Sequence, residues 1–74
     1  MGCALFVVHG ASRVGGRRVT VRDCGWDRVL GTAFSDHDLV VILEGAGVAD
    51  AEAAVDDPAW VEWRDGRPHD FHAV

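Results

Sequence analysis

The most constraining feature of the chain is the segment of residues 35–47, SDHDLVVILEGAG, which holds its longest apolar run. Ser35 stands three residues before Asp38, and this spacing is an acidic variant of the capping box that opens helices. Gly45 and Gly47 supply a helix stop at the other end of the segment. The segment therefore predicts a helix that begins directly after Ser35 and ends at the glycines.

The apolar residues of this segment also have helical spacing. One face would hold Leu39, Ile42, Leu43 and Ala46, at positions i, i+3, i+4 and i+7. The unbroken run of residues 39–43 fits a buried strand as well, so that alternative stays open. As a helix the segment would be apolar nearly all round, because Val40 and Val41 lie outside the main face. We therefore expect Val40 and Val41 to be covered by something else, such as a second subunit.

Seventy-four residues make one small domain, residues 1–74. A chain of this size buries only about 60% of its unfolded surface, so it is marginally stable without a disulfide, a metal or an oligomeric partner. Its hydrophobic content of 49% is high for so short a chain, and we expect a homo-oligomer. All seven basic residues are arginine, which is typical of a GC-rich bacterial genome.

The formal charge of -5 and the pI near 5.1 disfavour nucleic acid as a partner. Nucleic-acid binding would need a single basic face built from Arg13, Arg17, Arg18 and Arg22. The first residues lack the positive region of a signal peptide, and no apolar run reaches the roughly 18 residues that span a bilayer. We expect a soluble cytoplasmic protein with no membrane partner.

Residues 4–9 and 17–23 are predicted to be the first two strands of an antiparallel meander, joined by the turn SRVGG. A longer loop pairs Val8 with Val19, whereas a tighter turn pairs Val8 with Val21. The longer loop matches apolar residues better across the two strands.

The longer loop would also bring Cys3 opposite Cys24. A lone cysteine pair in a cytosolic chain is more often two reduced, buried thiols, and a disulfide is the alternative. Residues 28–34, broken by Gly31, are predicted as the third strand of the meander. Asp50 is the predicted N-cap of a brief second helix over residues 51–57.

Residues 59–71, AWVEWRDGRPHDF, predict a C-terminal hairpin around a type I′ turn at Asp65 and Gly66. This register would pair Trp60 with Phe71. The predicted fold is therefore α+β: a small antiparallel sheet, made of the N-terminal β-meander and the C-terminal hairpin, packed on one main helix and a short second helix.

The candidate metal ligands are His37, His69, His72 and Glu62, the last lying across the predicted hairpin from His69. Their spacing matches no HExxH, paired CxxC or calcium-loop pattern. We therefore expect Glu62 and His69 to form an exposed charge pair, and we predict no catalytic residue and no cofactor. The alternative function is a metal- or ligand-dependent accessory enzyme using His37, His69 and His72.

Trp60 and Trp63 are predicted on opposite faces of the hairpin, so one small core cannot hold both. Trp63 would lie beside Arg64 and Arg67, and tryptophan and arginine are enriched in binding hot spots. The alternative is that both tryptophans pack within the monomer. The predicted interaction residues are Trp60, Trp63, Arg64, Arg67, Val40 and Val41.

The leading functional hypothesis is a non-enzymatic protein-protein interaction module. It would be a small acidic accessory protein, antitoxin-like or immunity-like, that self-associates or binds a partner protein. A basic partner surface is favoured by the acidic residues Asp36, Asp38, Asp56 and Asp57.

Overall fold

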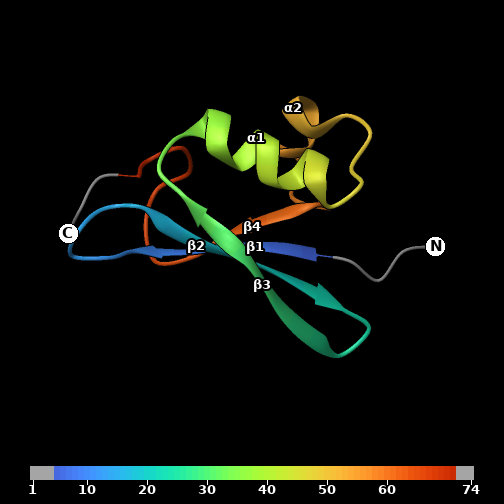
Figure 1. The fold of residues 1–74 in the computed structure, drawn as a ribbon, viewed down its shortest axis with the longest axis horizontal. Coiled ribbons are helices and arrows are strands. Elements are labelled where there is room, and N and C mark those ends of the chain that lie inside the picture. Colours follow the sequence, from blue (N-terminus) through green and yellow to red (C-terminus); the bar gives the residue numbers. More distant parts are fainter. Residues whose placement is uncertain (1–4, 72–74) are drawn as a thin grey trace.

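The computed structural model describes residues 5–71 as a four-stranded mixed sheet with two helices on one of its faces (Figure 1). The elements are β1 (Leu5–Ala11), β2 (Arg17–Asp23), β3 (Trp26–Ala33), α1 (Asp36–Gly45), α2 (Ala51–Ala54) and β4 (Val61–Trp63). The strands lie in the order β3-β2-β1-β4, with β4 parallel to β1 and the other neighbours antiparallel. The predicted α+β class, with one main helix and a short second helix, is confirmed.

The register of β1 and β2 is the one that the longer loop predicts, with Val8 opposite Val19. Cys24 lies in the turn between β2 and β3, and its sulfur is in a disulfide bond. The expectation of a reduced thiol is therefore wrong for Cys24, while Cys3 lies outside the described residues.

The third strand starts earlier than predicted, at Trp26, and contains a β-bulge. Gly31 pairs with Val19 and Val29 pairs with Thr20, so the intervening residue of β3 has no partner on β2. The end of the β2–β3 hairpin extends beyond the helices (Figure 1). We call this end, residues 21–29, the β-arm.

The start of α1 follows the predicted capping box. The backbone N–H of Asp38 donates to Ser35 Oγ at 3.3 Å, and Asp38 Oδ2 accepts from the backbone N–H of Phe34 at 3.0 Å. The N–H of Asp38 is one of the donors that a helix start leaves unpaired, and the return bond of Asp38 reaches Phe34, the residue before the N-cap. This segment is a helix, so the buried-strand alternative is wrong.

The end of α1 is a Schellman motif. Gly47 has a φ of 97° and donates its N–H to the carbonyl of Glu44 at 3.0 Å, while Val48 donates to the carbonyl of Leu43 at 3.1 Å. Gly47 therefore stops the helix, because it adopts a left-handed conformation at little cost, whereas Gly45 is the last helical residue.

The core lies between the sheet and the helices, where Leu39 and Leu43 of α1 are fully buried. Val40 is half-buried and packs against this core, whereas Val41 is 51% exposed. Val41 is therefore left uncovered by the rest of the chain, as expected, whereas Val40 is partly covered by the chain's own core.

The predicted C-terminal hairpin is wrong. Asp65 and Gly66 have positive φ values, 53° and 149°, but that of Gly66 is far from the roughly 90° of the predicted type I′ turn. Among the described residues after α2, only β4 forms a strand. It pairs with β1, with Val61 opposite Phe6. The chain reaches β4 after crossing the helical side of the sheet, and such a crossover brings a strand back parallel to its neighbour.

Candidate functional site

Arg17 is a buried arginine that fastens the C-terminal segment to the sheet. Its side chain is on the core side of β2, and the residue is only 1% exposed. Its guanidinium donates to the carbonyl oxygens of His9 (2.5 Å), Arg64 (2.5 Å), Arg67 (2.7 Å), Asp70 (3.1 Å) and Val8 (3.4 Å). The bonds to Arg64, Arg67 and Asp70 satisfy carbonyls of the segment after β4, which has no strand partner. Burial lowers the pKa of Arg17, and the nearby charges of Asp70 and Asp65 oppose that shift.

The burial of Arg17 corrects one expectation about nucleic acid. A basic face made of Arg13, Arg17, Arg18 and Arg22 does not exist, because the guanidinium of Arg17 is enclosed by backbone carbonyls. Arg18 and Arg22 stay exposed on their strand, and Arg22 pairs with Asp27 at 3.2 Å.

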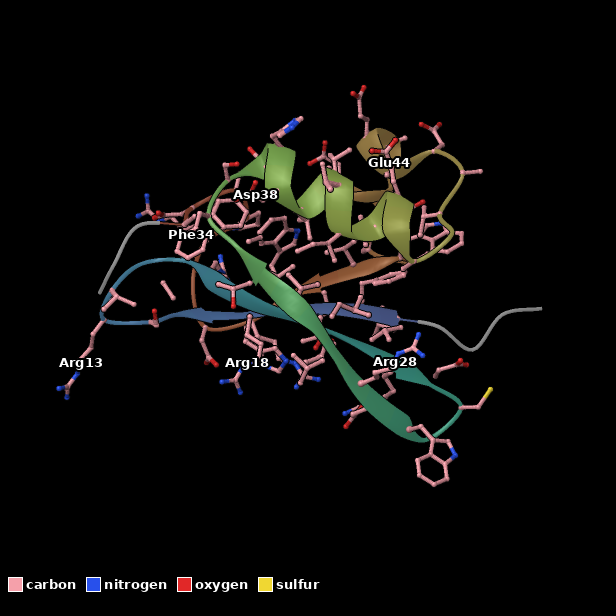
Figure 2. The ribbon with its side chains drawn as sticks, in the orientation of Figure 1. Arg13, Arg18, Arg28, Phe34, Asp38 and Glu44 are labelled. Atoms are coloured by element: carbon pink, nitrogen blue, oxygen red, sulfur yellow. The ribbon has the colours of Figure 1, made fainter. Side chains whose placement is uncertain are left out.

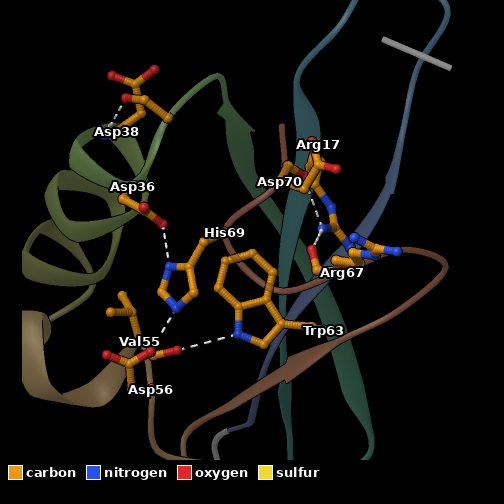
Figure 3. A network of polar contacts seen from close by, with 10 residues as sticks. Arg17, Asp36, Asp38, Val55, Asp56, Trp63, Arg67, His69 and Asp70 are labelled. Atoms are coloured by element: carbon orange, nitrogen blue, oxygen red, sulfur yellow. Dashed lines mark hydrogen bonds and ion pairs between the residues drawn. The ribbon is translucent and has the colours of Figure 1, made fainter. Parts of the chain in front are cut away.

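His69 bridges the two helices through its ring (Figure 3). Its Nδ1 lies 2.6 Å from Asp36 Oδ1 at the start of α1, and its Nε2 lies 2.6 Å from Asp56 Oδ1 beyond α2. Ionised carboxylates only accept hydrogen bonds, so a ring that donates to both is the imidazolium. The hydrogen bond to Asp36 is the largest cause that raises the pKa of His69; partial burial opposes it, and Asp56 adds to it.

Trp63 lies between these two polar groups and is packed within the chain. Its ring centroid is 5.0 Å from that of His69, and its ring lies 5.2 Å from the guanidinium carbon of Arg17. Its Nε1–H donates to the carbonyl of Val55 at 3.2 Å (Figure 3). Trp63 therefore fits the alternative in which the tryptophans pack within the monomer, and it does not fit an exposed hot spot.

The surroundings of His69 do not form a nucleophilic centre. Ser35 lies with His69 along a cavity of about 270 Å³. General-base catalysis needs a ring nitrogen that is free to take the proton of the nucleophile. Both nitrogens of His69 are already bonded to carboxylates, so His69 is not a free base for Ser35.

The structure does not bring the candidate metal ligands together. Glu62 forms its ion pair with Arg64, so the predicted pair of Glu62 and His69 is wrong. His37 is exposed on α1, and His72 lies outside the described residues. Within residues 5–71 no group of three His, Cys, Asp or Glu side chains is arranged to hold a metal ion.

The six predicted interaction residues have different surroundings. Trp63 is packed as described, Arg64 is paired with Glu62, and the carbonyl of Arg67 accepts from Arg17. Trp60 is 43% exposed, and Val41 is exposed on α1. Only Trp60 and Val41 of this set present large apolar surfaces to the solvent.

Charge is segregated between the two sides of the molecule, a signal that the sequence interpretation missed. We define the helical layer as residues 35–60, which contain no arginine or lysine, so that all seven arginines lie elsewhere. The acidic residues of the helical layer are Asp36, Asp38, Glu44, Asp50, Glu52, Asp56 and Asp57. Figure 2 shows Asp38 and Glu44 on the helical side and Arg13, Arg18 and Arg28 along the sheet side.

The carboxylates of the helical layer fall into two groups. Asp36 and Asp56 hold His69, Asp38 caps α1, and Asp57 Oδ1 accepts from the backbone N–H of Ala59 at 2.9 Å. The remaining three have no hydrogen bond or ion pair within the part of the chain that the structure describes: Glu44, Asp50 and Glu52. These three are available to an outside partner.

A pocket lies beside Trp60 in the helical layer. We call it the Trp60 pocket; it has a volume of about 430 Å³ and is lined by residues 47–50, Ala53, Ala54, Asp57 and Trp60. It combines a half-exposed indole, small apolar side chains and the carboxylates of Asp50 and Asp57. A second exposed region is the β-arm, where Trp26 is 81% and Val29 is 63% exposed.

None of the helices within residues 5–71 is both long and apolar enough to cross a membrane. No protein family, curated protein or solved structure matches this chain.

Proposed function

We propose that this protein is a non-enzymatic protein-protein interaction module whose helical layer binds a basic partner protein. The supporting observation is the segregation of charge, with acidic residues and no arginine or lysine over residues 35–60. A surface of one sign attracts a partner of the opposite sign over a distance and repels partners of the same sign. Such a surface favours a small acidic accessory protein of the bacterial cytoplasm, antitoxin-like or immunity-like.

The cost of the acidic surface to the isolated chain also supports a partner. Like charges repel one another and destabilise a compact fold, and the carboxylates of Glu44, Asp50 and Glu52 gain no internal ion pair within residues 5–71 in return. A basic partner would relieve this repulsion on binding.

The test is affinity capture with two variants of equal charge. The helical-layer variant carries Glu44→Gln, Asp50→Asn, Glu52→Gln and Asp57→Asn. The control variant carries Asp23→Asn, Asp27→Asn, Glu62→Gln and Asp65→Asn, which remove as many charges elsewhere. The proposal predicts that the wild type and the control retain one basic protein and that the helical-layer variant loses it. Equal retention by both variants, or equal loss from both, would contradict the proposal.

Self-association is a second candidate function, favoured by the β-arm. Trp26 and Val29 are large apolar side chains on opposite faces of β3, and both are mostly exposed; a contact with a second copy would bury them. A native mass spectrum of the purified protein reads the subunit count directly. A dimer or larger species in the wild type, reduced to a monomer by Trp26→Ala, would support self-association, and a monomeric wild type would exclude it.

A further inference from the structure

We propose that the Trp60 pocket receives one arginine side chain of the basic partner. This inference rests on the proposed function, because it names the group that the helical layer recognises. The pocket offers an indole face, two carboxylates and small apolar side chains in one cavity of about 430 Å³. An arginine has the matching parts: a planar cation and an apolar stem.

The guanidinium would stack on Trp60 and be bonded by the carboxylates. A cation within about 6 Å of an indole centroid is attracted by the ring, and arginine stacks on it through its planar group. Asp50 makes no side-chain bond as the residue before α2, and Asp57 uses only Oδ1 internally. Acceptor oxygens of both residues thus remain for the five donors of an arginine.

The apolar part of the arginine also has a complement. Its methylene stem would cover Ala49 and Ala53, which are exposed in the pocket, because long cationic side chains lay their stems along apolar surface and keep the charged end wet. The chain itself contains the same type of contact, since Arg17 lies over the ring of Trp63 at 5.2 Å.

The main chain that carries Trp60 and Asp57 is held in place before any ligand binds. The backbone N–H groups of Trp60 and Val61 both donate to the carbonyl of Asp57 at 2.9 Å. The carbonyl of Trp60 accepts from Phe6 of β1 at 2.8 Å, which ties this turn to the sheet. A site that is already ordered loses little entropy on binding.

Charge identifies the occupant as an arginine of a different protein rather than of a second copy. Each copy carries a formal net charge of -5, so two copies repel each other as a whole. A basic partner adds favourable long-range attraction to the contact in the pocket.

The test is an NMR titration of the isotope-labelled protein with the peptide acetyl-Gly-Arg-Gly-amide. The matched probe replaces arginine by citrulline, which has a similar shape and no charge. With arginine, the indole N–H of Trp60 and the amides of Asp50 and Asp57 should shift and saturate. We expect the citrulline peptide to bind about fivefold more weakly or worse, the effect of one cation–π contact.

Three variants locate the site. Trp60→Ala and Asp50→Asn should each weaken the arginine-dependent shifts. Asp50→Asn keeps the indole in place, so it still tests the site if Trp60→Ala disturbs the fold. Trp26→Ala removes an exposed tryptophan of the β-arm and should leave the shifts unchanged. Equal shifts with both peptides, insensitivity to Trp60→Ala and Asp50→Asn, or no shift up to about 20 mM peptide, which fills most of a millimolar site, would overturn the inference.

The outcome is separable from that of the proposed function. If Trp60→Ala still captures the basic partner that the helical-layer variant loses, the pocket assignment is wrong and the function stands. If neither variant affects capture, both are wrong. A self-assembly that is lost with Trp60→Ala and also with Arg13→Ala would place a second copy's arginine in the pocket and overturn the choice of a different protein.

Discussion

Arg17 and Arg18 are adjacent in sequence and have opposite environments. The side chain of Arg17 is enclosed and bonded to backbone carbonyls, whereas that of Arg18 is exposed. Arg17→Met would remove the donor from the partly buried carbonyls of His9, Arg64 and Arg67, and each acceptor left unpaired costs up to about 1–3 kcal/mol. We expect Arg17→Met to lower the free energy of unfolding by about 3 kcal/mol or more, and Arg18→Met to change it by less than about 0.5 kcal/mol. Urea denaturation measures both, and similar losses would contradict the role of Arg17.

His69 should make stability depend on pH. Its pKa is raised in the folded protein, so its contribution is fully present below the ordinary value of about 6.5 and is lost as pH rises through the raised value. The groups that face the ring are Asp36 from α1 and Asp56 beyond α2. Because the side chain is 36% exposed, we expect His69→Gln to lose at most about 1 kcal/mol at low pH and less at high pH.

Thermal unfolding of the wild type and His69→Gln across the pH range measures this difference. His37→Gln is the control, because it removes an exposed histidine of α1 without touching the contact between His69 and the two aspartates. A stability gap between the wild type and His69→Gln that stays constant with pH, or grows as pH rises, would show that the ring is not held as an imidazolium.

The contacts of Arg17 and His69 were beyond sequence interpretation for a physical reason. Strand alternation puts Arg17 and Arg18 on opposite faces, but arginine is a residue type that is almost never fully buried, so a solvated Arg17 was the natural expectation. His69 meets Asp36 and Asp56 only because the chain after β4 brings it between the start of α1 and the residues that follow α2. Nothing in the local spacing of these residues indicates that meeting.

At the scale of elements, α1 is the segment that the sequence predicts best, because its start and stop are built from neighbouring residues. The bonds of Ser35 and Asp38 and the conformation of Gly47 involve only residues a few positions apart. The positive sign of φ at Asp65 and Gly66 was also predicted correctly. The hairpin was not, because strand pairing depends on where the chain has been carried by the preceding helices.

Gly45 and Gly47 offer a matched pair of substitutions at the end of α1. Gly47 has a φ of 97°, which an alanine adopts only under strain, whereas Gly45 is the last helical residue and has open space around it. We expect Gly47→Ala to destabilise the protein by about 1 kcal/mol and Gly45→Ala to stabilise it by about 0.5 kcal/mol. Urea denaturation of the two variants gives both signs, and two changes of the same sign would contradict the Schellman stop.

At the scale of the whole molecule, the main feature is its polarity. The helical layer carries no arginine, and Arg13, Arg18 and Arg28 lie along the sheet side (Figure 2). Composition alone reports a moderately acidic chain, and the fold concentrates that acidity on one side. The notion of a basic partner was therefore available from the sequence, whereas the surface that would receive it required the fold.

The central claim is that a basic partner binds the helical layer. Hydrogen–deuterium exchange of the protein alone and in complex with the captured partner tests where contact occurs. We expect slower exchange in residues 44–60 and no change in the β-arm, since contact with a partner shields backbone amides and their hydrogen bonds from solvent. Slower exchange confined to β2 and β3, with residues 44–60 unaffected, would contradict the claim and move the interface to the sheet.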